Sequence, residues 1–389
     1  MTLPERPAVV GLSGERFRAV YHLTGDKAEA RAKAEDITIE QTIEFPADLA
    51  PEGDIRDHII GRIERLRRLK SGRWEAVISY AVETAGPDLA QFLNVIFGNI
   101  SIKPGIRLMR LDLPPALLAR FKGPRFGRAG VRQLVKVHNR PLMCSALKPM
   151  GLSSADLADM AYRFALGGLD LIKDDHGLAN QPFSPFQTRV EQCAAAVARA
   201  NRETGLNCLY LPNITAPADK IAAYARFARD AGAGGLLICP GIVGFDTMRA
   251  LADDDGVNLP IMSHPSFYGS MVTSPRSGIS HYALYGQLQR LAGADMSIYP
   301  NFGGRFSFSV DECRSIVAGT QDAMGHLKPC FPAPGGGMTM EKVPLMNAVY
   351  GTEVVYLIGG GLHRHSRDLT ANVRYFMRLI QPERLEAEE

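Results

Sequence analysis

The feature that most constrains this 389-residue chain is a unit that repeats from Pro141 onward. Each unit has a short apolar run, a loop containing Gly, Pro or Asn, and an amphipathic segment rich in Ala, Leu and Arg. The starts of the apolar runs lie 24 to 38 residues apart, which leaves room for one strand, one helix and two loops each time. The eight runs are LMCSAL from 142, LDLI from 169, NCLYLP from 207, GLLICP from 235, LPIMSH from 259, DMSIYP from 295, KPCFPAP from 328 and VVYLIGGG from 354.

Strands that are buried on both faces read as continuous apolar runs, and helical connections force them into parallel order. Eight such units therefore predict a (β/α)₈ barrel over residues 136–389. The alternative is a doubly wound open sheet, which would need a GxGxxG turn after its first strand. The segment LKPMGLSS at that place does not match this pattern, so the barrel is favoured.

Residues 1–135 show a different pattern, which predicts an α+β domain of ferredoxin-like type. Strands are expected at 16–23, 36–45, 74–82 and 105–112, with an Ala-rich segment at 26–34. Helices are expected at 54–70 and 88–97, and the segment 121–133 has the composition of a linker. The basic run 62–73 is interpreted as a solvated helix face, because Ile63, Leu66 and Leu69 recur at helical spacing.

The composition excludes several classes of partner. Lys and Arg exceed Asp and Glu by 44 − 41 = 3, so no nucleic-acid surface is expected. The six cysteines include no CxxC pair and four of them fall inside apolar runs, which predicts core thiols in a reducing compartment. No apolar span of about 18 residues and no signal segment occurs, so no membrane association and a cytoplasmic location are predicted.

Ionisable side chains follow several predicted strands, where a barrel places its active site. Strand one ends at Lys148, strand two at Lys173, Asp175 and His176, and strand five at His264. Because side chains alternate along a strand, Lys173 and Asp175 share a face while Asp174 points away. If the segment Lys173–Asp175 stood alone, a local salt bridge would explain it. At the mouth of a barrel, the same side chains could bind a divalent ion, or the lysine could act as a base.

Two glycine triplets follow the last two strands, 335–337 and 359–361. In barrels this is a frequent position for phosphate held on backbone amides. One triplet alone would indicate only a tight turn, whereas two on adjacent strands predict a phosphate site.

The segments ALKPMGLS and GGLDLIKDDHGLANQPF, together with FGNISIKPGIR in the N-terminal part, resemble the large-subunit family of ribulose bisphosphate carboxylase, and in particular its RuBisCO-like branch. The resemblance covers nearly the whole chain. It implies that Lys173 is the lysine that is carbamylated in true carboxylases, with Asp175 and His176 at the neighbouring Mg²⁺-ligand positions. It also implies that Lys148 transfers protons and that His264 is the strand-five histidine of the site.

The same resemblance assigns phosphate binding to Gly336, Gly337, Gly359 and Gly360. It assigns Glu40 and Asn99 to the part of the site that a second subunit contributes, so a homodimer with shared active sites is implied.

Several positions depart from the carboxylases. His176 replaces a carboxylate, which removes a hard anionic oxygen from the expected metal site. Arg305 is the nearest cation where carboxylases have a loop lysine, and Pro265 stands in place of an arginine that holds a second phosphate. Tyr299 occurs near the place of another histidine.

These departures predict an enzyme that forms an enediolate from a monophosphorylated ketose or keto sugar acid, and not from ribulose bisphosphate. The reaction would be an isomerisation or enolisation, or the decarboxylation of a β-keto acid. The predicted catalytic residues are Lys148, Lys173, His264, Arg305, Glu40 and Asn99. Two alternatives are residual carboxylase activity and a sugar-phosphate-binding protein without turnover.

Overall fold

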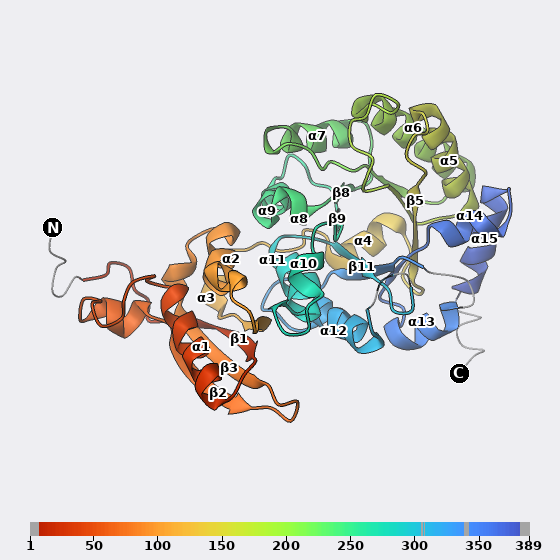
Figure 1. The fold of residues 1–389 in the computed structure, drawn as a ribbon. Helices are drawn as coiled ribbons and strands as arrows, with labels where there is room; N and C mark the ends of the chain where they lie inside the picture. Colours follow the sequence, from red (N-terminus) through yellow and green to blue (C-terminus); the bar gives the residue numbers. More distant parts are fainter. Residues whose placement is uncertain (1–7, 305, 307, 338–341, 382–389) are drawn as a thin grey trace. The chain divides into compact units, whose positions relative to one another are not determined.

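The computed structural model describes residues 8–304, 306, 308–337 and 342–381, which fall into two compact units (Figure 1). The first unit contains the chain up to Lys122 together with Tyr268–Leu288 and Ala323–Leu327. The second contains Gly123–Phe267, Gln289–Asp322 and the chain from Lys328 onward. The predicted domain boundary lay after residue 135, so the two divisions differ in the segments 123–135, 268–288 and 323–327.

The first unit contains a five-stranded sheet in the order β10-β4-β1-β3-β2. The strands β1 to β4 pair antiparallel, and β10 adds in parallel to β4. The helix α1 packs on β1, β2 and β3. The chain order β1-α1-β2-β3-α2-β4 with the sheet order 4-1-3-2 is the ferredoxin-like arrangement, as predicted. The elements are β1 (Arg16–Leu23), α1 (Lys27–Glu40), η1 (Ile55–Ile59), β2 (Arg62–Arg68), β3 (Trp74–Ala81), η2 (Val82–Ala85), α2 (Leu89–Phe97), η3 (Asn99–Ile102), β4 (Ile106–Asp112), α3 (Pro115–Leu118), α10 (Gly269–Val272), β10 (Gly278–Ile279) and η4 (Ala283–Gln287).

Three local predictions in this part are wrong. The strand expected at 36–45 is the end of α1, whose buried residues Ala30, Ala34, Ile37 and Thr38 recur at helical spacing. A capping box between Asp26 and Glu29 fixes the start of this helix.

The helix expected at 54–70 consists instead of the short η1 and the edge strand β2. A β-bulge between Ile63 and Arg65 breaks the alternation of side chains, and so produces the apolar spacing that suggested a helix. Across the strand pair, Arg65 and Arg67 both lie 2.9 Å from Oε1 of Glu75. The basic run is therefore the charged edge of a sheet.

The second unit contains eight parallel strands in the order β7-β6-β5-β13-β12-β11-β9-β8. A parallel bridge between Asn213 and Leu237 joins β7 to β8, so the ring closes into the predicted (β/α)₈ barrel. All eight apolar runs supply one strand each: β5 (Leu142–Leu147), β6 (Leu171–Asp174), β7 (Leu209–Leu211), β8 (Leu236–Ile238), β9 (Ile261–Ser263), β11 (Met296–Pro300), β12 (Phe331–Gly335) and β13 (Val355–Leu357).

Helices alternate with these strands and lie outside the ring, as α5 to α7 show in Figure 1. They are α4 (Gly127–Val135), α5 (Ser154–Gly167), α6 (Phe186–Thr204), α7 (Ala218–Asp230), α8 (Pro240–Val243), α9 (Phe245–Asp253), α11 (Leu288–Leu291), α12 (Val310–Gln321), α13 (Val343–Tyr350), α14 (Gly360–His365) and α15 (Leu369–Leu379). The helix α4 occupies much of the expected linker 121–133. Its Val131 and Val135 belong to the same buried cluster as side chains from all eight strands, among them Leu142 and Phe331.

All six cysteines are buried free thiols, including the four whose place in apolar runs predicted it. In the described ranges, the structure has no helix of the length and apolarity needed to span a membrane. The cytoplasmic location stays a prediction.

Candidate active site

The barrel brings the predicted strand-end residues together at one end of the ring. Lys148 follows β5, Asp175 and His176 follow β6, and His264 follows β9. In the ring order β6 and β9 are separated by β7 and β8, so contact between their ends occurs across the mouth. Parallel strands place all their carboxyl ends on the same side, which explains the convergence.

Asp175 is the centre of this group. Its Oδ2 lies 3.1 Å from Nζ of Lys148, and its Oδ1 lies 2.7 Å from Nδ1 of His176. Burial by itself would raise the pKa of Asp175, but the contact with His176 and the charge of Lys148 outweigh burial and lower this pKa. Asp175 is therefore an anion that holds two basic side chains at the mouth.

The imidazole rings of His176 and His264 stack with their centroids 4.2 Å apart and their planes at 10°. Nδ1 of His264 lies 2.9 Å from the hydroxyl of Ser266. Burial, together with the charge of Lys173, lowers the pKa of His264 well below its usual value. His264 is consequently a neutral ring near neutral pH, able to donate or accept one hydrogen bond at the mouth.

Lys173 is almost completely buried at the end of β6, and its Nζ donates to the backbone carbonyl of Asp174 at 3.0 Å. Burial lowers the pKa of this ammonium group. A buried amine of this kind can accept a proton, and its neutral form can react with carbon dioxide.

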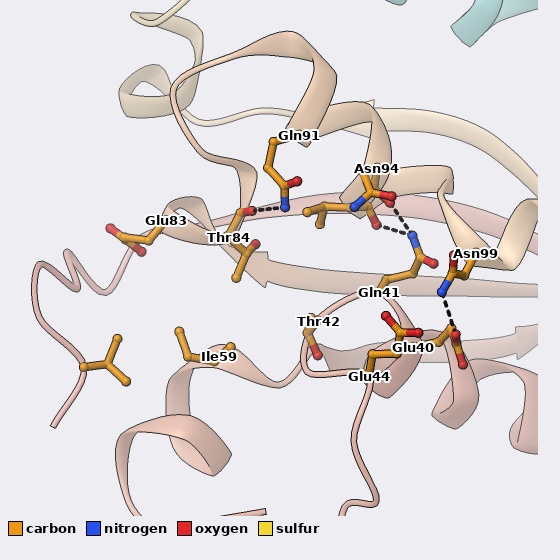
Figure 2. A pocket seen from close by; sticks show the side chains of 12 residues that line it. Glu40, Gln41, Thr42, Glu44, Ile59, Glu83, Thr84, Gln91, Asn94 and Asn99 are labelled. Atoms are coloured by element: carbon orange, nitrogen blue, oxygen red, sulfur yellow. Dashed lines mark hydrogen bonds between the residues drawn. The ribbon is translucent and has the colours of Figure 1, made fainter. Parts of the chain in front are cut away.

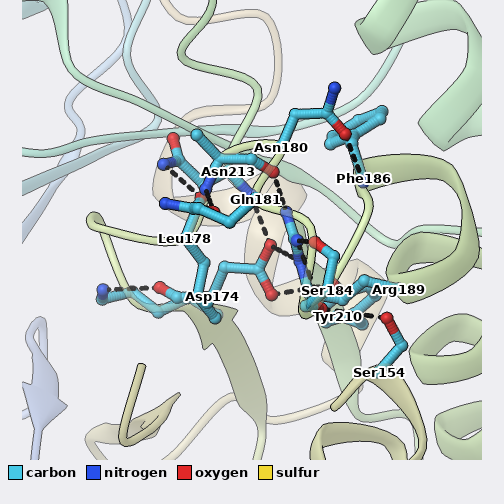
Figure 3. A network of polar contacts seen from close by, with 12 residues as sticks. Ser154, Asp174, Leu178, Asn180, Gln181, Ser184, Phe186, Arg189, Tyr210 and Asn213 are labelled. Atoms are coloured by element: carbon cyan, nitrogen blue, oxygen red, sulfur yellow. Dashed lines mark hydrogen bonds and ion pairs between the residues drawn. The ribbon is translucent and has the colours of Figure 1, made fainter. Parts of the chain in front are cut away.

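Asp174 faces away from the mouth, as the alternation of side chains predicted (Figure 3). Its Oδ2 accepts hydrogen bonds from Nε of Arg189 at 2.9 Å and from the backbone N–H of Asn213 at 3.0 Å. Its Oδ1 accepts the hydroxyl of Tyr210 at 2.8 Å. The side chains of Asp174 and Arg189 are both 0% exposed, so this is a buried ion pair behind the site.

The predicted phosphate glycines lie in the loops after two neighbouring strands. Gly336 and Gly337 follow β12 and have φ of 83° and 88°, which a residue with a side chain rarely adopts. Gly359 and Gly360 follow β13, and a Cβ atom added at either would have no other atom within 4 Å. In the ring, β13 lies between β12 and β5, the strand that carries Lys148. Arg305 and residues 338–341 lie outside the described residues.

The two predicted N-terminal site residues contact each other in the first unit. Nδ2 of Asn99 donates to Oε1 of Glu40 at 3.0 Å, and Nζ of Lys103 lies 3.2 Å from Oε2 of Glu40. The hydrogen bond from Asn99 and the contact with Lys103 lower the pKa of Glu40. Both predicted residues line a polar cavity of about 410 Å³, shown in Figure 2.

The Mg²⁺ that the resemblance implies can be tested against the donors present. The buried Oδ1 of Asp175 makes no hydrogen bond of good geometry to any described residue, and Nδ1 of His176 lies beside it. Mg²⁺ requires oxygen ligands, and an unmodified Lys173 offers none. Within the described part of the chain, no group of three His, Cys, Asp or Glu side chains could hold a metal. The unmodified donors therefore do not complete a Mg²⁺ site, and a second oxyanion would have to come from a carbamate on Lys173.

One mouth residue was not predicted to act. His363 in α14 lies close enough to Lys148 that burial and the charge of Lys148 both lower its pKa. Its Nε2 is buried and has no hydrogen-bond partner among the residues that the structure describes. The sequence signal was its position two residues after the second glycine triplet, which fits a surface histidine equally well.

Comparison with known proteins adds relatives that cover nearly the whole chain. The profile described as ribulose bisphosphate carboxylase large chain, catalytic domain, matches residues 128–304. A 5-methylthioribulose-1-phosphate isomerase from Rhodospirillum rubrum is 39% identical over 364 residues, which are 93% of this chain and 96% of that protein. A 2,3-diketo-5-methylthiopentyl-1-phosphate enolase from Geobacillus kaustophilus is 32% identical over 375 residues, 92% of this chain and 90% of the relative.

A solved structure has the same fold. The crystal structure of a Rubisco-like protein from Rhodopseudomonas palustris superposes with a TM-score of 0.85 at 38% identity, covering 93% of this chain and 97% of that one.

Proposed function

This chain belongs to the ribulose bisphosphate carboxylase large-chain family, in its RuBisCO-like branch, and from that membership we propose that it forms an enediolate from a monophosphorylated ketose without fixing carbon dioxide. The observation that carries this proposal is the contact chain Lys148–Asp175–His176–His264 at the barrel mouth. It provides an amine, a carboxylate and two imidazoles around one space, which suits proton transfer next to a carbonyl.

In the proposed reaction, an amine of Lys148 or Lys173 removes the proton from the carbon beside the substrate carbonyl. The electron pair of that C–H bond forms the C=C bond of the enediolate, and the carbonyl oxygen takes the negative charge. The ammonium group of the second lysine and a hydrogen bond from His264 offset this charge. An isomerisation is completed when a proton is added to the former carbonyl carbon and the proton of the adjacent hydroxyl moves to the enediolate oxygen, so that a new carbonyl forms on the neighbouring carbon. Addition of a proton to the enediolate oxygen alone completes an enolisation.

The substrate class follows from the two similar enzymes, which are named for methylthio sugar phosphates. We expect a substrate with one phosphate, bound on the glycine turns, and an apolar far end. Three exposed apolar side chains, Met150, Ile242 and Phe267, follow the strands β5, β8 and β9, and they are 51%, 58% and 74% exposed. These apolar side chains offer no hydrogen bond or charge to a second phosphate, whereas contact with them would remove a methylthio group from water. The screen described below tests which sugar phosphate is the substrate and whether the reaction is a decarboxylation.

Mg²⁺, when bound, would supply positive charge for the enediolate oxygen. Asp175, His176 and a carbamate on Lys173 would hold it. Removal of divalent ions with EDTA should abolish turnover, and Mg²⁺ with bicarbonate should restore it. Full turnover in EDTA would exclude an essential ion and leave the lysine ammonium groups as the charges that stabilise the enediolate.

We further propose that the chain acts as a homodimer in which Glu40 and Asn99 complete the partner's site. Their polar cavity in the ferredoxin-like unit is consistent with this role. Mixing an inactive Glu40→Gln variant with an inactive Lys148→Met variant should restore part of the turnover, because one of the two mixed sites then has both residues. No recovery at any mixing ratio would contradict shared sites.

The decisive experiment is a screen of phosphorylated ketoses in D₂O for deuterium wash-in beside the carbonyl. Wash-in with a methylthio pentulose phosphate, and none with ribulose bisphosphate, supports the proposal. Fixation of labelled carbon dioxide would favour residual carboxylase activity, and release of carbon dioxide from a β-keto acid would favour decarboxylation. Binding of sugar phosphates without any exchange would favour a binding protein.

A further inference from the structure

The turn that carries Asp175 and His176 has every carbonyl oxygen from residue 175 to residue 179 engaged by a hydrogen bond. The first is local, since the N–H of Leu178 donates to the carbonyl of Asp175 at 3.0 Å. The next four are made by three side chains from outside residues 175–179 (Figure 3). Turns usually leave such groups to water, so a turn with all five satisfied inside the protein is unusually constrained.

Asn213, which follows β7, makes two of these bonds. Its Nδ2 donates to the carbonyl of His176 at 3.0 Å and to the carbonyl of Leu178 at 2.8 Å. Its Oδ1 accepts the N–H of Thr215, and its own N–H donates to Asp174. The side chain is 1% exposed, and both of its donors and its acceptor are used.

Gln181 and Arg189 make the other two. Nε2 of Gln181 donates to the carbonyl of Gly177 at 2.7 Å, while its Oε1 accepts the N–H of Ala179 at 2.8 Å. Nη2 of Arg189 donates to the carbonyl of Ala179 at 2.7 Å, and Nε of the same side chain binds Asp174. The turn is thus fastened to β7 by Asn213 and to α6 by Arg189.

The turn contacts Met150 at Gly177. A Cβ atom at this residue would lie 2.6 Å from Cε of Met150 in the loop after β5. Cε is the end of a flexible side chain that is 51% exposed, so Met150 can move aside and does not fix the turn. The hydrogen bonds to Asn213, Gln181 and Arg189 are therefore what holds it.

We propose that Asn213 and Gln181 are positioning residues that fix the turn 175–179, and with it the direction in which Asp175 and His176 face the reacting group. Neither side chain needs to touch the substrate. The inference rests on the proposed function for its effect on turnover, because a misplacement of about 1 Å can cost on the order of 100-fold in rate.

The test uses shape-conserving variants of the full chain. Asn213→Asp and Gln181→Glu keep the acceptor oxygen but replace the donor group by a carboxylate oxygen, which repels the carbonyls. Gln181 is partly exposed, so Gln181→Glu keeps the test valid if Asn213→Asp does not fold.

Asn201 provides a matched control at the other end of β7. Its Nδ2 donates to the carbonyl of Cys208 at 2.9 Å and its Oδ1 accepts the N–H of Cys208 at 2.9 Å, so it fastens backbone in the same way outside the site. Asn201→Asp should lower the melting temperature without changing turnover per folded molecule.

Three measurements separate positioning from stability: the melting temperature, hydrogen exchange of the backbone amides over 175–181, and the deuterium wash-in rate. Both site variants should speed exchange in the turn and lower kcat about 10- to 100-fold with KM changed less than about threefold. The proposal is overturned if the turn keeps wild-type exchange in both variants, or if Asn201→Asp loses as much turnover.

Hydrogen exchange requires no substrate. If the wild type converts no sugar phosphate, the proposed function fails, while the exchange comparison still shows whether Asn213 and Gln181 hold the turn.

Discussion

Asp174 and Asp175 are neighbours in the chain, yet they lie in opposite environments. Asp174 is completely buried against Arg189 and Tyr210, behind the strand. Asp175 lies at the open mouth beside Lys148 and His176. The difference arises because consecutive side chains of a strand point to opposite faces. In a barrel one face packs against the outer helices, and the other faces the interior, which opens at the mouth.

This comparison suggests a division between two residues of the same type: Asp174 stabilises the fold, and Asp175 is available for the proposed reaction. A buried ion pair is costly to break, because the remaining partner is left as an uncompensated charge. The partners of Asp175 are more exposed, since the side chains of Lys148 and His176 are 39% and 44% exposed, so loss of Asp175 leaves charges that water can reach. Four experiments test this division, from the largest expected effect to the smallest.

Lys148→Met should lower the deuterium wash-in rate by about 10² to 10⁴, the range for loss of a well-placed general acid or base. The melting temperature should change less than in Asp174→Asn, because Lys148 is 39% exposed whereas Asp174 and Arg189 are 0% exposed. Near-full wash-in by a folded Lys148→Met protein would remove Lys148 from the reaction.

Asp174→Asn should lower the free energy of unfolding by about 3–5 kcal/mol, because Arg189 then keeps a buried charge without its partner. Urea denaturation measures the loss. The matched variant Asp175→Asn should lose less stability than Asp174→Asn while it loses turnover, because the partners Lys148 and His176 are 39% and 44% exposed. Equal destabilisation by the two variants would contradict the division between the two faces.

Tyr210→Phe removes one hydrogen bond to the carboxylate of Asp174 and keeps the ring in place. A loss of about 1.5–3 kcal/mol in unfolding free energy is expected, since the bond is made to a charged group. A double-mutant cycle with Asp174→Asn should show that most of this loss depends on the carboxylate. An unchanged effect in the Asp174→Asn background would show that the tyrosine acts by packing alone.

Lys103→Met gives the smallest expected effect. Lys103 lies 2.7 Å from Asp36 and 3.2 Å from Glu40, but the lysine and Asp36 are 37% and 41% exposed. Surface ion pairs of this kind contribute about 0–1 kcal/mol, so the melting temperature should hardly move. A loss as large as that of Asp174→Asn would show that exposure does not set the energetic difference between these pairs.

Much of the barrel and of its mouth could be predicted from the sequence. All eight apolar runs form strands, because strands buried on both faces have no polar alternation and must be joined by helices. The position of Lys148, Asp175 and His264 at strand ends then fixed which side of the barrel they share.

The failed predictions lie where tertiary context outweighs local pattern. The segment 36–40 has β-branched residues but continues α1, since Ile37 and Thr38 are buried on the same face as Ala34. The segment 62–68 has helical apolar spacing but pairs with β3, and a bulge accounts for the spacing.

The sequence by itself determined the order of the barrel strands, the ionisable groups at their ends and the family to which the chain belongs. Only the tertiary structure decided that His176 stacks on His264 across the mouth, that Arg189 is the partner of Asp174, and that Asn213 holds the turn of His176. The reason is that local spacing sets which way a side chain points from its own strand, whereas the partner it meets comes from a strand or helix whose place in the ring depends on closure of the whole barrel.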